Sequence, residues 1–111
     1  MTPSPVDLKI VGDRLALVRQ AVEESRALPA TDLASFTADR RNIWAADALL
    51  RRAIEALFDT ARHILANAHG HGGLEYREVA RLALEKGLVP QGRLADRLVT
   101  IAGFRNRLTH F

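Results

Sequence analysis

Apolar residues recur at helical spacing along most of the chain. Val11, Leu15, Val18 and Val22 follow one another at steps of four, three and four residues, which places them on one face of a helix. The same spacing continues through a longer second run: Ile43, Ala46, Leu50, Ala53 or Ile54, Leu57, Ala61, Ile64 and Ala68. No stretch alternates apolar and polar residues as a strand does. The pattern therefore predicts an all-α protein.

Breaks in this pattern divide the chain into helices. We expect a first helix over 5–28, a short helical turn over 31–36, a long helix over 37–68, and two more over 76–86 and 93–108. Pro29 ends the first helix, and the segment Gly70-His71-Gly72-Gly73 reads as a flexible loop. Gly87 stands where a left-handed C-terminal cap is expected. Short connections between amphipathic helices indicate a four- to five-helix bundle.

Length and composition narrow the class of protein. The 111 residues suit one domain, and no apolar run approaches the roughly 20 residues that a membrane span needs. Cysteine is absent, so a cytoplasmic setting without disulfides is the default expectation. The formal charge of +3 is a mild bias that permits an anionic partner without requiring one.

The last predicted helix carries an arginine where its apolar stripe requires an apolar side chain. The stripe runs Leu94, Leu98, Ile101, position 105 and Leu108, and position 105 is Arg105. Burying a guanidinium is costly unless a partner or a cleft receives it. Two interpretations follow: the stem packs on the helix with its head in water, or this face meets a cleft or a second subunit.

The neighbours of Arg105 favour the second interpretation. His110 can move a proton near neutral pH, and an arginine can hold a phosphate and stabilise charge that develops on it. Such a pair suits cleavage of a phosphodiester. On a straight helix the two residues lie roughly 140° apart, so we expect the helix to end or bend near Thr109, or the pair to meet across a dimer. Asn106 stands four residues before His110 and can orient its ring.

The segment Arg105-Asn106-x-x-x-His110 resembles the Arg-x4-His motif of the HEPN superfamily, and more narrowly its HepT-like group. The stretches 48–65 and 76–89 also resemble that group's long helix and its following segment. The likeness covers most of the chain and is weakest over the first thirty residues.

The resemblance implies a fold, an activity and partners. It implies a HEPN-type bundle over 1–111 that forms a homodimer, with both motifs lining one cleft. It also implies a metal-independent endoribonuclease toxin, without a cofactor, that a minimal nucleotidyltransferase neutralises as its antitoxin. His110 would be the acid/base, Arg105 the phosphate clamp and Asn106 a support, with Arg97 and Arg107 adding positive charge for the RNA. The group's motif continues to a Tyr that would follow Phe111, so we expect the domain to extend past this sequence.

Several alternatives stay open. The chain could be a non-catalytic accessory or substrate-binding subunit of a nucleotidyltransferase, or a structural helical dimer. Trp44 is expected in the core or a dimer interface. The pairs 40–41 and 51–52 could track RNA, but arginine pairs more often form a solvated helix face with nearby carboxylates. A metal site is not expected, although three histidines lie close together in the sequence: His63, His69 and His71.

Overall fold

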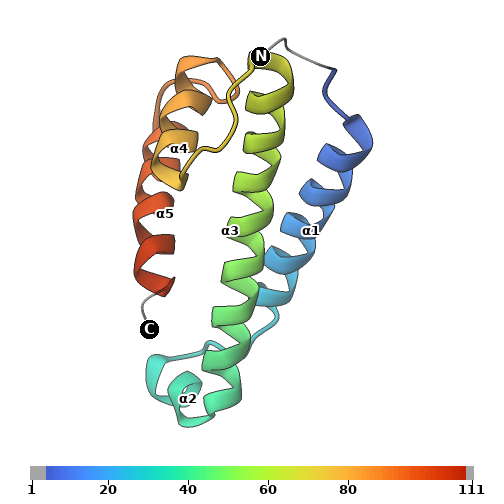
Figure 1. Cartoon of the computed structure of the whole chain (residues 1–111). Helices are drawn as coiled ribbons and strands as arrows, with labels where there is room; N and C mark the ends of the chain where they lie inside the picture. The colour runs from blue at the N-terminus through green and yellow to red at the C-terminus, as the bar shows by residue number, and fades with distance from the viewer. Residues whose placement is uncertain (1–4, 110–111) are drawn as a thin grey trace.

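The computed structural model describes residues 5–109, apart from the side chains of Asn106, Leu108 and Thr109. Over that range the chain forms helices and no strands, which confirms the predicted all-α bundle (Figure 1). The helices in chain order are α1 (Leu8–Arg26), α2 (Leu33–Ala38), α3 (Arg40–His69), α4 (Tyr76–Glu85) and α5 (Arg93–Thr109). The 30-residue helix α3 runs the length of the molecule, with α1 on one side and α4 and α5 on the other.

Aspartate caps set two helix starts later than the hydrophobic pattern predicted. The Asp7 carboxylate accepts hydrogen bonds from the backbone N–H groups of Lys9 and Ile10, so α1 begins at Leu8 rather than at position 5. Asp39 likewise accepts from the N–H of Arg41, and α3 begins at Arg40 rather than at position 37. A capping carboxylate satisfies N–H groups that have no partner inside the helix, which decides where the helix starts.

Two glycines end helices in the left-handed conformation. Gly87 has φ of 76° just after α4, as the sequence predicted. Gly70, which we expected to be part of a flexible loop, has φ of 73° and is the C-terminal cap of α3. There the His71 N–H donates to the Leu65 carbonyl at 2.9 Å, which satisfies a carbonyl of the last turn.

The hydrophobic core lies between α3, α4 and α5. Its largest fully buried side chains are Phe58, Leu65 and Val79, and Leu98 packs with them from α5. Phe58 is off the stripe predicted for α3, whereas its neighbour Leu57 is on the stripe but half-buried. Because α3 packs against α1 on one side and α4 and α5 on the other, its buried surface is wider than a single stripe.

Other apolar side chains stay exposed. Ile43 and Leu50 lie on the predicted stripe of α3 but are exposed, and so is Trp44, at 65%. Trp44 therefore does not belong to the core, and its predicted place in a dimer interface stays a prediction. Ile43 and Trp44 belong to the first turns of α3, whereas Leu50 lines a hollow together with Ile101 and Phe104 of α5.

An apolar groove separates α1 from α5. The two helices make no close contact in the described part of the chain, although α1 packs along α3. Leu57 lines two hollows, one of about 340 Å³ between α1, α3 and α5, and one of about 200 Å³ lined mainly by α1, α3 and α4. The wider hollow is lined by Val18 and Val22 of α1 and by Phe104 of α5.

Within the described residues, no helix combines the length and the apolar character that a membrane span requires.

Candidate functional site

Arg105 lies on the buried stripe of α5. Among the described side chains of this helix, Ala95, Leu98 and Ala102 are buried, and Arg105 follows at the next helical step. The Arg105 side chain is 29% exposed, so most of it is covered by protein. Leu94, which we placed on the stripe, is 51% exposed. The small residues Ala95 and Ala102 make the close contacts instead, because they let α5 approach its neighbours.

The covered face of Arg105 rests on an aromatic ring. The Arg105 Cζ lies 4.7 Å from the centroid of the Tyr76 ring, within the range of a cation–π contact. Tyr76 is the first residue of α4, and a capping box between Glu75 and Glu78 fixes this helix start. The ring also packs against Phe58 of the core, with centroids 4.8 Å apart. The Tyr76 ring therefore joins the guanidinium to the core.

A carboxylate of α3 lies beside the same guanidinium. Glu55 Oε1 is 3.8 Å from Arg105 Nη2, and the Glu55 side chain is 52% exposed. This distance is longer than a charge-assisted hydrogen bond, so the contact is mainly Coulombic. A pair this open to solvent contributes on the order of 0–1 kcal/mol to stability.

A second arginine contacts Tyr76 from α3. The Arg62 Cζ lies 4.6 Å from the ring centroid, and its Nε donates to the Leu74 carbonyl at 3.0 Å. Arg62 also pairs with Asp59 at 3.4 Å. Arg62 thus ties the segment before α4 to α3.

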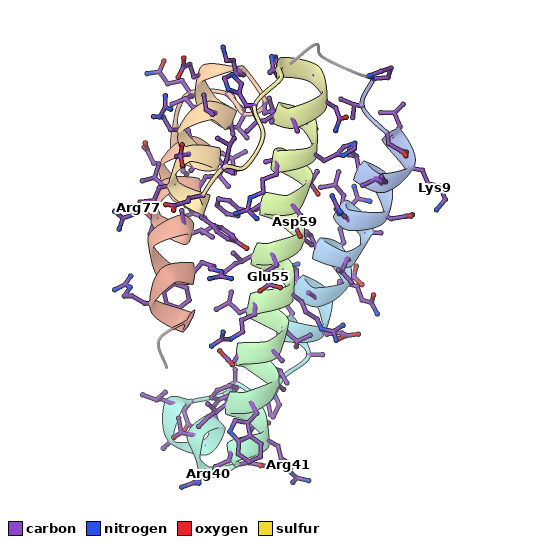
Figure 2. The ribbon with its side chains drawn as sticks, in the orientation of Figure 1. Lys9, Arg40, Arg41, Glu55, Asp59 and Arg77 are labelled. Carbon is purple, nitrogen blue, oxygen red and sulfur yellow. The ribbon has the colours of Figure 1, made fainter. Side chains whose placement is uncertain are left out.

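Hydrophobic spacing does not indicate this group, because Glu55, Asp59 and Arg62 lie off the apolar stripe of α3. Glu55, Asp59 and Arg62 follow one another at steps of four and three, and Glu55 and Asp59 are drawn one turn apart in Figure 2. That spacing is itself helical, and it could have indicated a second, polar stripe facing a neighbouring element.

Two of the other predicted site residues, Arg97 and Arg107, are not gathered around Arg105. Arg97 is exposed two turns earlier in α5. Arg107 points to another side of the helix, where it lies over the Phe104 ring at 5.7 Å and lines the apolar groove. The backbone of Asn106 belongs to α5, but its side chain and the whole of His110 lie outside the described residues. The predicted pairing of Arg105 with His110 therefore stays a prediction.

One arginine of each remaining pair and one of the histidines have structural contacts. Arg41 pairs with Asp39 at 2.9 Å and Arg51 with Asp47 at 3.0 Å, as expected for a solvated helix face. The Arg41 guanidinium lowers the pKa of Asp39 by hydrogen bonding at the start of α3, where Figure 2 labels Arg41. His63 Nε2 accepts a hydrogen bond from the Asp7 N–H at 3.0 Å. In the described residues no three His, Asp or Glu side chains cluster as a metal site.

A comparison with protein families decides the classification. The family model described as "Ribonuclease HepT-like" matches residues 18–111, which is most of the chain and includes α2 to α5. The chain belongs to the HepT-like ribonuclease family. No curated protein and no solved structure matches it significantly. The HepT-like match contains Arg105, Asn106 and His110, and its family name indicates ribonuclease activity.

Proposed function

We propose that this HepT-like chain is a metal-independent endoribonuclease that acts as a toxin. The observation that carries the proposal is Arg105, a mostly covered guanidinium held by Tyr76 and Glu55 inside a ribonuclease family match. A fixed guanidinium suits a phosphate, because it can make two parallel hydrogen bonds to it and needs little reorganisation during the reaction.

The proposed reaction is attack of an RNA 2′-hydroxyl on the adjacent phosphate. The new O2′–P bond forms as the P–O5′ bond breaks, which leaves a 2′,3′-cyclic phosphate and a 5′-hydroxyl. His110 moves the proton, Arg105 stabilises the negative charge on the phosphorane, and Asn106 orients His110. Arg97 and Arg107 would contact flanking phosphates, Arg97 from an exposed position on α5.

Cleavage of RNA in the presence of a chelator tests this reaction. The parent protein should cleave with EDTA present, and His110→Ala should lose activity by about a hundredfold or more, in line with the loss of a general acid or base. His69→Ala is the matched control, because His69 is an exposed histidine at the end of α3. Cleavage by the His110→Ala protein at the parent's rate would contradict the proposed mechanism.

The apolar groove between α1 and α5 supports a homodimer. Val22 and Leu50 line it and are each 39% exposed, and Phe104 is 38% exposed. HEPN proteins are typically dimeric, and pairing two such grooves would cover apolar side chains that the single chain leaves in water. Arg107, which also lines the groove, would then lie at the subunit interface close to the motif.

Sedimentation of matched charge variants tests the dimer. Val22→Glu should shift the protein toward a monomer, because it places a charge in the groove. Leu84→Glu on α4 is the control, since Leu84 has the same 39% exposure but does not line the groove. A Val22→Glu protein that keeps the parent's mass would contradict this interface.

The proposed partner is a minimal nucleotidyltransferase that neutralises the toxin. Co-expression with a nucleotidyltransferase encoded next to this chain should restore growth and yield a complex that purifies together. Co-purification with no RNA cleavage by the free chain would instead favour an accessory subunit of a nucleotidyltransferase.

A further inference from the structure

We propose that Glu55 and Tyr76 are positioning residues that hold the Arg105 guanidinium in one orientation. This inference rests on the proposed function, since it explains how Arg105 would be ready for a phosphate. The two residues come from α3 and α4, so the fold itself, rather than α5 alone, fixes the direction of the arginine head.

The need for positioning follows from the flexibility of arginine. Its side chain has many accessible rotamers, and a phosphate contact would have to overcome that entropy in an unrestrained residue. The Tyr76 ring restricts the guanidinium from one side at 4.7 Å, and the Glu55 carboxylate attracts Nη2 from another at 3.8 Å. Two restraints from different helices define an orientation that neither defines alone.

Tyr76 is itself held firmly. Phe58, at 1% exposure, packs against its ring, and Arg62 lies over it while bonded to the Leu74 carbonyl and paired with Asp59. The ring stands at the start of α4, where the backbone is capped. A movement of the Tyr76 ring would therefore disturb both the core and the segment that precedes α4.

Glu55 leaves the guanidinium able to bind a substrate. Its side chain is half-exposed, and the 3.8 Å separation is too long for a hydrogen bond to Arg105, so this carboxylate does not take up the guanidinium's hydrogen-bond donors. A phosphate can therefore bind those donors while Glu55 stays beside Nη2. The negative charge of Glu55 opposes phosphate binding, and it keeps the guanidinium correctly aimed during the reaction.

This arrangement predicts opposite effects on binding and on turnover. Glu55→Gln removes the competing charge, so KM for RNA should stay the same or fall. The guanidinium loses one restraint, so kcat should fall about ten- to hundredfold, the scale of a misplacement near 1 Å. Glu55→Asp keeps the charge and should recover part of kcat. Asp47→Asn is the matched control, because it breaks an arginine pair on the same helix, and both constants should stay within twofold.

Side-chain NMR tests the orientation without relying on cleavage. The ¹⁵N–¹Hε signal of Arg105, assigned by its loss in Arg105→Lys, should be ordered in the parent and less ordered in Glu55→Gln and in Tyr76→Leu. If the parent protein cleaves no RNA, the proposed function fails, and this signal still decides the positioning. Equal order in all three proteins would overturn the inference, and so would an unchanged kcat in a cleaving Glu55→Gln protein.

Discussion

The Arg105 guanidinium lies over the Tyr76 ring, with Cζ 4.7 Å from the ring centroid. The contact joins α5 to the first residue of α4, and through Phe58 it reaches the core formed with α3. One aromatic ring therefore links the proposed phosphate clamp to the packing of three helices. Changes at Tyr76 should affect both stability and activity, and the size of each effect can be estimated.

Removing the Tyr76 ring should weaken the fold measurably. Tyr76→Leu loses two cation–π contacts, each about 0.5–1 kcal/mol, together with the packing on Phe58. We expect a loss of about 1–3 kcal/mol in the free energy of unfolding, measured by urea titration followed by circular dichroism. Tyr76→Phe keeps the ring and should stay within about 1 kcal/mol of the parent. Similar losses in both variants would show that the hydroxyl, rather than the ring, stabilises this junction.

The core should be most sensitive at Phe58. This side chain is 1% exposed and contacts the cluster shared by α3 and α4. Phe58→Ala should cost about 3–5 kcal/mol, which can unfold a small domain outright. Leu94→Ala is the control, because Leu94 is 51% exposed despite its place on the predicted stripe, and it should cost well under 1 kcal/mol. Denaturant midpoints compare the two, and comparable costs would contradict the described core.

His63 should hold the start of α1 against α3. Its Nε2 accepts the Asp7 N–H, a contact between residues 56 positions apart. His63→Leu removes the acceptor, so the Asp7 amide should exchange its hydrogen at least several-fold faster. His71→Leu, in the loop after α3, should leave that amide unchanged. Hydrogen exchange measured by NMR makes the comparison. An unchanged exchange rate of the Asp7 amide in His63→Leu would show that His63 does not hold the start of α1.

Two helix caps should make the stability of the fold depend on pH in the acid range. Backbone and hydroxyl hydrogen bonds from Ser35 lower the pKa of Asp32, and the Arg41 guanidinium lowers that of Asp39. The folded state therefore binds these protons less readily than the unfolded state. Their contribution is complete above the unfolded value near 3.8 and is lost as pH falls through the folded value.

The double variant Asp32→Asn/Asp39→Asn isolates this pH effect. Its melting temperature should fall less than that of the parent between pH 6 and pH 2.5, because the substituted side chains do not titrate. Circular dichroism melts at both pH values give the comparison. Parallel pH profiles for the two proteins would rule out a role for these caps.

The regular parts of the fold could be predicted from the sequence. The apolar spacing of α1 and α3 and the glycine after α4 gave the helices within a few residues. Their exact starts depended on Asp7 and Asp39, whose capping hydrogen bonds are a local competition that hydrophobic spacing does not report. The exposure of Trp44 could not be predicted, because it depends on how far α5 extends along α3.

The sequence allowed a prediction for Arg105 of this site, but not for its neighbours Glu55 and Tyr76. Arg105 interrupts an apolar stripe, so its covered position was visible as an anomaly of spacing. Glu55 and Tyr76 interrupt nothing: one belongs to the charged side of α3, and the other reads as an ordinary first residue of α4. Their contact with Arg105 depends on the packing of α3, α4 and α5, which no local pattern specifies.

Single-turnover cleavage of an RNA oligonucleotide in EDTA, by the parent, Arg105→Ala and Arg81→Ala proteins, tests the central claim most directly. Arg81 forms a surface pair with Glu85 on α4 and serves as the matched control. Arg105→Ala should slow the chemical step by about 10²–10³-fold, the usual cost of losing one donor to developing negative charge, while Arg81→Ala cleaves like the parent. Cleavage by Arg105→Ala at the parent's rate would contradict the account.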